Sequence, residues 1–328
     1  MKISVAIITA NPDREQLSDC LHSINSQRVI KADEIRIYDS SDDNSVFGIA
    51  ESYHARVIKL LPNESTRGNK IQIKDPVKYF KTEIVKKIVN ETDDDNILIL
   101  LSDDCRLDPS AISELFRYFL KYQDLALIYG RQIADPDCNH LTRYVHNIFF
   151  PITRRDLPLW HLMKIYCSFN FVAYRVKFIK EEGVMPSEET SEDMFDNIYM
   201  SGKLSDKGYR TMYNPLAICH RNRELNVFYV YQYTRGLFRF LKSNDWLTEK
   251  WWIRKTDLES FFINFKEYIR NYSSIPFSSF YATVCFTAAK IGELLAEIDY
   301  QRSLKRKTLN SKDLIATTLF DKENKLYK

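Results

Sequence analysis

Residues 96–109 read Asn96-Ile97-Leu98-Ile99-Leu100-Leu101-Ser102-Asp103-Asp104-Cys105-Arg106-Leu107-Asp108-Pro109. The apolar run from Ile97 to Leu101 is too short for a buried helix and does not alternate with polar residues, so it predicts a central parallel strand covered on both faces. Ser102, Asp103 and Asp104 follow at the carboxyl end of this strand, which is where open α/β sheets bind ligands. Two adjacent carboxylates repel each other unless a positive charge lies near them, and a hard divalent cation that bridges to phosphate oxygens is the usual solution. The stretch therefore predicts an α/β sheet with an acidic site at its edge.

The composition is that of a globular protein without a nucleic-acid signature. The chain has 328 residues, of which 45% are hydrophobic, so it can bury a real core in one large domain or in a domain with an appendage. With 47 basic and 44 acidic residues the formal net charge is only +3, which does not predict a nucleic-acid partner. The chain holds only 8 glycines and neither the dinucleotide-binding nor the P-loop glycine motif, so both of these nucleotide sites are disfavoured.

The cysteines and the apolar segments predict a cytoplasmic protein. The 6 cysteines include no C-x-x-C pair, and the amino end has no charged-then-apolar leader, which favours a reduced compartment and disfavours zinc. The longest apolar stretches near the carboxyl end, such as Phe277 to Phe286, are interrupted by serine and threonine and are too short to span a membrane. We expect a cytoplasmic location, with or without peripheral contact with the inner face of the membrane.

Strand-like and helix-like segments alternate along the first two thirds of the chain. Besides 97–101, the predicted strands are Ile3–Ile8, Glu34–Tyr38, Arg56–Leu61, Leu125–Tyr129, Phe169–Tyr174, Tyr209–Tyr213 and Leu216–Cys219. Helices are predicted after Asn11-Pro12-Asp13, from Pro76 to Val89 and from Asp108-Pro109 to about Leu120, and the acidic cluster Ser187 to Asp193 opens another that ends at Gly208. Between Gly130 and Tyr166 the periodicity fades. The alternation is typical of a mostly parallel, right-handed α/β sheet.

The character of the chain changes after Arg223. From there aromatic residues such as Phe228 and Tyr231 interleave with basic ones such as Arg235. We therefore predict a main domain over 1–223 and a helical, aromatic and basic extension over 224–328. Packing of this extension against the main domain is the default interpretation. Contact with a membrane surface and contact between copies of the chain are the alternatives.

A series of short motifs occurs in order between Lys2 and Arg221. They are Ile7-Ile8-Thr9-Ala10-Asn11, Leu21-His22-Ser23-Ile24-Asn25-Ser26-Gln27, Tyr38-Asp39-Ser40-Ser41-Asp42-Asp43-Asn44-Ser45, Ser102-Asp103-Asp104, Glu192-Asp193 and Gly208-Tyr209-Arg210. Together they resemble the threonine-x-asparagine turn, the glutamine-ended helix, the acidic second-strand loop, the D-x-D signature, the glutamate-aspartate pair and the glycine-tyrosine-arginine element of the family 2 inverting glycosyltransferases. The resemblance implies the GT-A fold: a mostly parallel sheet flanked by helices.

The resemblance also implies a nucleotide-sugar site and its residues. The implied binding residues are Thr9, Asn11, Asp39, Asp42, Asp43, Arg67 and Asp103. Asp39 would read the base or ribose, Asp103 would lie against the ribose or the sugar, and the loop after Asp39 does not distinguish Asp42 from Asp43. Arg67, Lys78 or Lys81 would replace the positive charge of an arginine-asparagine pair that is not present before the metal strand.

A metal and a catalytic base are implied in the same way. Asp104 would hold Mn²⁺ or Mg²⁺ against the diphosphate, with His220 near the metal, while Ser102 stands where the first acid of the triplet is expected. Asp193 would be the catalytic base, and Glu192 would orient the acceptor or raise the proton affinity of the base by like-charge repulsion. Without the resemblance, Glu192 and Asp193 would read as a solvated helix start and His220 as a structural histidine.

The sequence therefore predicts a metal-dependent inverting glycosyltransferase. Its donor would be a nucleoside-diphosphate sugar, and its acceptor a glycan or lipid-linked glycan of a surface polysaccharide pathway. Two alternatives stay open. One is a catalytically dead GT-A relative that acts as a binding subunit, which Ser102 and Ala10 suggest. The other is a sugar nucleotidyltransferase, which the missing glycine-rich amino-terminal loop disfavours.

Overall fold

The structure is a computed structural model that describes residues 1–60, 76–149, 157–158, 170–185, 196–222, 225–243, 280–281 and 283–302. In chain order the elements are β1 (Ile3–Thr9), α1 (Arg14–Asn25), β2 (Glu34–Asp39), α2 (Ser45–Ser52), β3 (Arg56–Lys59), α3 (Pro76–Glu91), β4 (Ile97–Ser102), β5 (Cys105–Leu107), α4 (Ala111–Lys121), β6 (Leu125–Ala134), α5 (His140–Phe149), β7 (Leu157–Pro158), β8 (Phe171–Arg175), α6 (Val176–Glu182), α7 (Asp196–Asp206), β9 (Arg210–Arg221) and α8 (Val227–Ser243). Residues 283–302 are also helical.

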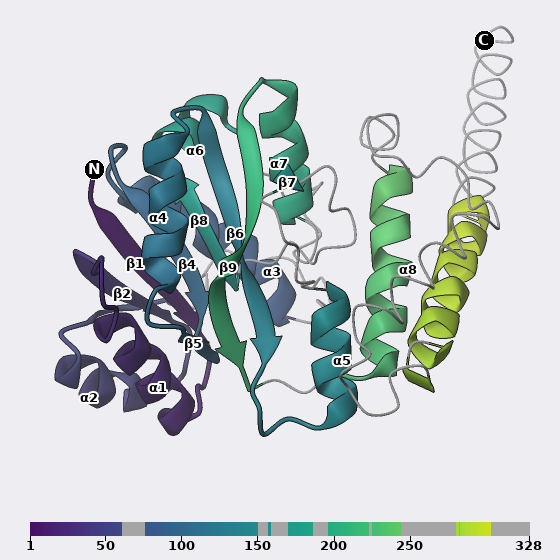
Figure 1. Cartoon of the computed structure of the whole chain (residues 1–328), viewed down its shortest axis with the longest axis horizontal. Coiled ribbons are helices and arrows are strands. Elements are labelled where there is room, and N and C mark those ends of the chain that lie inside the picture. The colour runs from purple at the N-terminus through teal and green to yellow at the C-terminus, as the bar shows by residue number, and fades with distance from the viewer. Residues whose placement is uncertain are drawn as a thin grey trace, which may run out of the picture. The chain divides into compact units, whose positions relative to one another are not determined.

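A mixed sheet lies at the centre of the main part of the chain (Figure 1). Its strand order is β3-β2-β1-β4-β8-β6-β9-β5, with β7 also paired to β9. β1 to β4 are parallel to one another, β8 is antiparallel to both of its neighbours, β6 and β9 are parallel, and β5 is antiparallel to β9. The predicted α/β sheet is confirmed, and its second half is mixed where the alternation of elements predicted parallel strands.

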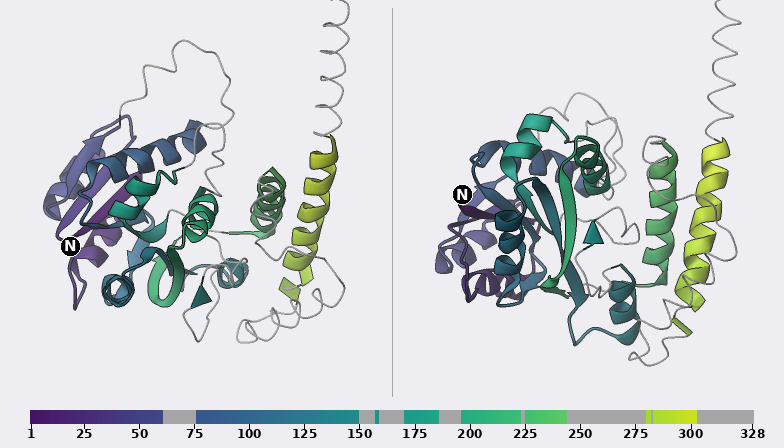
Figure 2. Two further views of the ribbon diagram at one scale, coloured as in Figure 1. Left: turned by 90° about the horizontal axis from the view of Figure 1, so that it is seen from above. Right: turned by 45° about the horizontal axis from the view of Figure 1, so that its top comes forward.

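Strand β4 is buried on both faces, as its unbroken apolar run predicts. Ile97, Ile99 and Leu101 belong to one core cluster with residues of α1, α2 and α4. Leu98 and Leu100 are equally buried and point to the other face, because side chains alternate along a strand. Figure 2 shows α3 and α4 on opposite sides of the sheet. Helices on both faces thus leave the strand ends as the exposed parts of the sheet.

Three segments differ from the sequence prediction. The two short strands predicted over 209–219 form the single strand β9, in which the pairing with β6 skips residues 215–217 and the side chain of Asn214 accepts a hydrogen bond from the Leu216 N–H (2.9 Å). Strand β5 was not predicted, because its three residues have no pattern of their own and form a strand only by pairing with β9. The region after Gly130 continues β6 to Ala134 and then forms α5.

The described residues fall into two compact units, one that ends at Leu225 and one that begins at Asn226. Within the second unit, Arg235 on α8 forms an ion pair with Asp299 (Nη2–Oδ2 2.6 Å). At Gly292 a Cβ atom would lie 2.8 Å from the carbonyl oxygen of Tyr231, so α8 and residues 283–302 pack backbone to backbone there. The domain boundary that we predicted after Arg223, between residues 1–223 and 224–328, remains a proposal.

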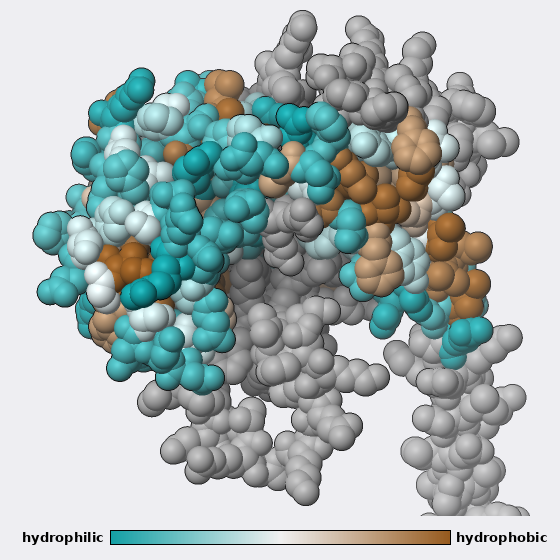
Figure 3. Space-filling view, turned by 90° about the horizontal axis from the view of Figure 1, so that it is seen from below, coloured by the Kyte–Doolittle hydropathy of each residue, from teal (hydrophilic) through white to brown (hydrophobic). Residues whose placement is uncertain are grey.

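The surface of the second unit exposes apolar side chains, among them Phe228, Phe280, Ile291 and Leu294. Figure 3 shows hydrophobic residues exposed on the helices of this unit. No helix in the described part of the chain combines the length and the apolar content that crossing a membrane requires.

Candidate functional site

Three adjacent parallel strands bring candidate residues to one edge of the sheet. Thr9 at the end of β1 pairs with Asp39 at the end of β2, and Ile8 pairs with Ser102 at the end of β4. The strands end together because their apolar runs have similar lengths and are in parallel register. Thr9, Asp39 and Asp103 therefore share the carboxyl edge of β2-β1-β4, which is the ligand-binding edge of open α/β sheets.

Asp39 is completely buried and its carboxylate is fully engaged. One oxygen, Oδ1, accepts hydrogen bonds from the backbone N–H (2.9 Å) and the hydroxyl (2.5 Å) of Ser41. The other, Oδ2, lies 2.7 Å from the ammonium of Lys59 on β3. The same ammonium donates to the carbonyl oxygens of Ser41 (3.0 Å) and Asp43. Asp39 and Lys59 thus neutralise each other and fix the loop that follows β2.

The loop over 40–44 holds the other second-strand candidates. Asn11 adopts a positive φ of 50° and its N–H donates to the Ser41 hydroxyl (2.7 Å), which ties the β1 loop to the β2 loop. Asp43 accepts hydrogen bonds from the hydroxyl (2.7 Å) and N–H (3.1 Å) of Ser45, and these bonds lower its pKa. Asp42 is exposed. Both acids are therefore exposed to solvent, and Asp43 in addition holds the start of α2.

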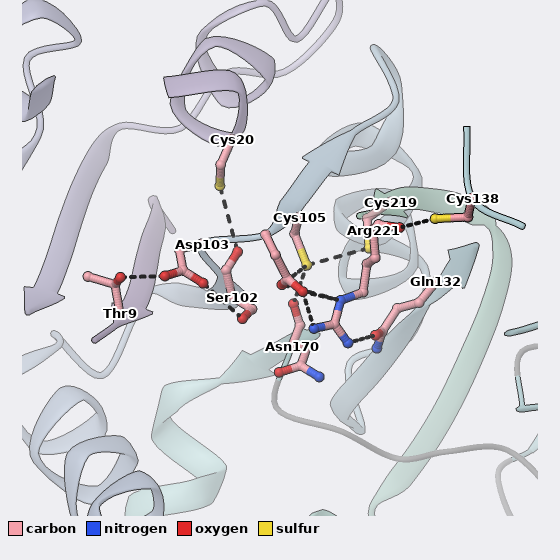
Figure 4. A network of polar contacts seen from close by, with 11 residues as sticks. Thr9, Cys20, Ser102, Asp103, Cys105, Gln132, Cys138, Asn170, Cys219 and Arg221 are labelled. Carbon is pink, nitrogen blue, oxygen red and sulfur yellow. Dashed lines mark hydrogen bonds and ion pairs between the residues drawn. The ribbon is translucent and has the colours of Figure 1, made fainter. Parts of the chain in front are cut away.

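The two carboxylates after β4 point in different directions. Asp103 accepts a hydrogen bond from the Thr9 hydroxyl on β1. Asp104 instead faces β9, where the guanidinium of Arg221 donates through Nε (3.1 Å) and Nη2 (2.5 Å) to its Oδ2. Figure 4 shows Thr9 and Arg221 on opposite sides of this turn. The adjacent acids are thus separated by the fold rather than gathered around one point.

Arg221 is held by a buried network. Its side chain is 4% exposed and that of Asp104 is 13% exposed. Its Nη1 donates to the side-chain oxygen of Gln132 on β6 (3.2 Å), and Gln132 is fully buried. Burial alone would lower the pKa of Arg221, but the negative charge of Asp104 and their hydrogen bonds outweigh it and raise the pKa. The arginine therefore stays charged and fixed.

His220 lies on the other face of the same strand. Its Nε2 is 2.9 Å from Oδ1 of Asp108, and its strand partner is Arg106. Neighbouring residues of a strand point to opposite faces, so Arg221 reaches Asp104 and His220 does not. The structure thus brings an arginine to the place where the resemblance predicts a histidine.

The residues around Asp104 do not fit a divalent cation in the geometry that the chain adopts. Both carboxylate oxygens of Asp104 face the Arg221 guanidinium, and the described ranges contain no group of three or more His, Cys, Asp or Glu side chains placed to hold a metal. The nearby thiol of Cys219 is also a poor ligand, because burial raises its pKa and only a thiolate binds metal well. The Mn²⁺ or Mg²⁺ site at Asp104 and His220 stays a prediction.

Three candidates, Arg67, Glu192 and Asp193, lie outside the described residues. Helix α7 begins soon after the last two, lies beside β9 (Figure 1) and turns into it at Gly208, which has a φ of 88°. Its first turn is tied to the sheet: the Tyr174 hydroxyl donates to the side-chain oxygen of Asn197 (2.7 Å), and the Tyr129 hydroxyl donates to the Asn197 carbonyl (3.1 Å).

Sequence reasoning missed Lys59, Gln132 and Arg221. Each acts through a strand partner far away in sequence: Lys59 pairs with Asp39, and Gln132 pairs with Cys219 on the strand that carries Arg221. The only local signal was that Arg221 directly follows His220. The order of the strands in the sheet was needed to use it.

No protein-family model matches the chain. The chain is 28% identical to the O-antigen chain rhamnosyltransferase RfbN of Salmonella typhimurium over 137 residues, which are 40% of this chain. That match spans only 42% of the length of the curated relative.

Solved structures of other proteins are similar to this chain. TarS of S. aureus matches with a TM-score of 0.51 at 14% sequence identity, over 89% of this chain and 55% of the TarS chain. The mannosyltransferase PcManGT of Pyrobaculum calidifontis, solved in complex with GDP-Man and Mn²⁺, matches with a TM-score of 0.49 at 13% identity, over 92% of this chain and 80% of that one. The similarity to TarS concerns the fold alone. The predicted GT-A fold is confirmed.

Proposed function

We propose that this chain is a glycosyltransferase that moves a sugar from a nucleoside-diphosphate sugar to a hydroxyl of a glycan or glycolipid acceptor, with inversion at the anomeric carbon. The observation that carries the proposal is the meeting of Thr9, Asp39 and Asp103 at the carboxyl edge of β2-β1-β4 in a GT-A sheet. The partial likeness to an O-antigen rhamnosyltransferase supports surface polysaccharide synthesis as the setting.

The donor would bind across the ends of β1, β2 and β4. The loop after Asp39, which Lys59 and Ser41 hold in place, would take the base and ribose, with Asn11 and exposed Asp42 beside it. Asp103, oriented by the Thr9 hydroxyl, would accept a hydrogen bond from a hydroxyl of the ribose or the sugar. These contacts would position the anomeric carbon for attack from the opposite side.

The chemical step is one displacement. The acceptor oxygen forms a bond to the anomeric carbon while the bond from that carbon to the diphosphate oxygen breaks, and the leaving nucleoside diphosphate takes the electron pair. A carboxylate within hydrogen-bond reach takes the proton of the acceptor hydroxyl, which contributes about 10²–10⁴-fold in rate. We propose Asp193 as this base and Glu192 as the residue that orients the acceptor. In sequence, Asp193 comes shortly before α7, whose first turn Tyr174 and Tyr129 hold to the sheet.

Turnover of sugar nucleotides tests the proposal. UDP-, GDP-, CDP- and dTDP-sugars would be incubated with the full chain and a panel of glycan and lipid-linked glycan acceptors, and the released nucleotide identified. Release of a nucleoside diphosphate that is lost in Asp193→Asn, with donor binding kept, supports the proposal. Release of pyrophosphate from a nucleoside triphosphate and a sugar phosphate would indicate a nucleotidyltransferase instead.

The binding-subunit alternative keeps one supporting observation, the occupation of Asp104 by Arg221. Donor binding without any turnover across the acceptor panel would favour it. Contact of the second unit with a membrane surface stays a prediction, and so does the identity of the acceptor.

A further inference from the structure

The contact between Asp104 and Arg221 bears on how the proposed donor would be bound. In the described part of the chain, Asp104 is the acid at the end of β4 that faces β9, and Arg221 covers both of its oxygens. A divalent cation coordinated by Asp104 would have to displace this guanidinium and then lie beside it in a nearly buried place. Breaking a buried ion pair and placing two cations together are both unfavourable.

The Arg221 guanidinium also has N–H groups that neither Asp104 nor Gln132 uses. Its Nε and one N–H of Nη2 are used by Asp104, and one N–H of Nη1 is used by Gln132. A guanidinium carries two N–H groups on each Nη, so one on Nη1 and one on Nη2 have no partner among the described residues. Two such groups in one plane match two oxygens of a phosphate, and an arginine whose other side is already bound loses little freedom when it binds one.

We propose that Arg221, oriented by Asp104 and Gln132, binds the diphosphate of the donor, and that nucleotide binding by this chain needs no divalent cation at Asp104. The inference rests on the proposed function, because it concerns the donor's diphosphate. Asp104 is then a positioning residue that holds the guanidinium from behind.

The first test uses the wild-type chain and measures the dissociation constants of UDP, GDP, CDP and dTDP by calorimetry, once with EDTA and once with Mn²⁺. The expected result is that one nucleotide binds with constants that differ by less than about tenfold between the two conditions. Binding that appears only with Mn²⁺ would overturn the inference and leave the proposed function standing. Absence of binding under both conditions would overturn the proposed function together with the inference.

The second test compares two arginines on the same strand pair. Arg221→Lys keeps a positive charge but loses the planar fork, so the nucleotide should bind about tenfold more weakly or worse with EDTA present. Arg106→Lys is the matched control: Arg106 lies on the other face of β5 and β9, is 47% exposed and forms an ion pair with Asp135 (2.7 Å), so its change should leave binding unaltered. Equal binding by wild type and Arg221→Lys would refute the contact with the diphosphate.

A third measurement needs neither a nucleotide nor a stable Arg221 variant. Free Mn²⁺ is followed by electron paramagnetic resonance as the wild-type chain is added. The signal should persist, because Arg221 occupies Asp104. Binding of Mn²⁺ that disappears in Asp104→Asn would show that the cation displaces the arginine, and would overturn the inference.

Discussion

The ammonium of Lys59 lies 2.7 Å from Oδ2 of Asp39, across the pairing of β3 with β2. Asp39 is completely buried, whereas the Lys59 side chain is 25% exposed. The partly exposed lysine therefore balances the buried negative charge of Asp39. Since the same ammonium also reaches the carbonyl oxygens of Ser41 and Asp43, it joins the end of the third strand to the loop after the second.

Replacing Lys59 by methionine should destabilise the chain by about 3 kcal/mol, because it leaves the buried carboxylate of Asp39 unpaired while partial exposure of the lysine limits the loss. Urea unfolding measures the change. The double variant Asp39→Asn with Lys59→Met should recover part of the lost stability. If Lys59→Met unfolds at the same urea concentration as wild type, the ion pair does not stabilise this edge of the sheet.

Asp104→Asn and Arg221→Gln should each cost about 3–5 kcal/mol of unfolding free energy, since each leaves a buried partner uncompensated. The double variant should cost clearly less than the sum, with a coupling of at least about 1 kcal/mol. Denaturant unfolding of all four chains gives the cycle. Arg106→Gln, from the more exposed pair on the other face, should change stability by less than about 1 kcal/mol. Strict additivity at Asp104 and Arg221 would contradict the ion pair.

Tyr174→Phe should lower the turnover number while leaving the donor dissociation constant unchanged. The variant removes the hydrogen bond to Asn197, which costs about 1 kcal/mol of stability and loosens the first turn of α7. Steady-state kinetics combined with donor calorimetry separates the two effects. Tyr209→Phe, which removes a hydrogen bond to Glu182 of α6 just beyond the carboxyl end of α7, is the control and should keep normal turnover. An equal fall in both variants would mean that general loss of stability is being measured.

Gly130→Ala should destabilise the chain by at least about 1–3 kcal/mol, because overpacking a core costs that much. The new Cβ atom would lie 2.0 Å from the ring of Phe171 on β8, at the point where the pairing of β6 with β9 changes register. Thermal unfolding measures the effect. Gly48→Ala in α2 is the opposite case: nothing lies within 4 Å of its Cβ, and it should gain about 0.5–1 kcal/mol from helix propensity. A Gly130→Ala chain as stable as wild type would show that Phe171 can move aside.

The strands of the first half could be predicted from the sequence because each carries its own signal. The runs Ile3–Ile8 and Ile97–Leu101 are short, apolar and bounded by polar residues, and both are strands in the structure to within one residue at the carboxyl end. Burial on both faces of a sheet selects such runs locally, so no information about distant residues is needed.

The second half of the sheet could not be predicted in the same way. Asn214 and Pro215 read as a turn between two strands, yet the chain continues as β9 because the Asn214 side chain satisfies the Leu216 N–H and the pairing resumes at Ile218. Strand β5 exists only through its contacts with β9, which lies more than 100 residues away in sequence. Pairing between distant strands leaves no trace in local periodicity.

The same limit explains what was missed in the candidate site. Asp39, Asp103 and Asp104 end predicted strands, so their location at one edge of the sheet followed from the pattern. Which way each carboxylate points depends on the neighbouring strand. Thr9 faces Asp103 because β1 adjoins β4, and Arg221 faces Asp104 because β9 adjoins β5.

The side chains of Asp103 and Asp104 point in different directions, and this has an evolutionary consequence. Asp103 is hydrogen-bonded to Thr9 on β1, and Asp104 forms an ion pair with Arg221 on β9. Substitutions should therefore occur in two independent pairs of positions. Among homologues, position 103 should covary with position 9, and position 104 with position 221, with little correlation between 103 and 104 themselves. A lineage that no longer binds a donor could therefore exchange the Asp104–Arg221 pair for two apolar residues while keeping Thr9 and Asp103 intact. In such lineages the adjacent acids would diverge as two separate characters rather than as a single motif.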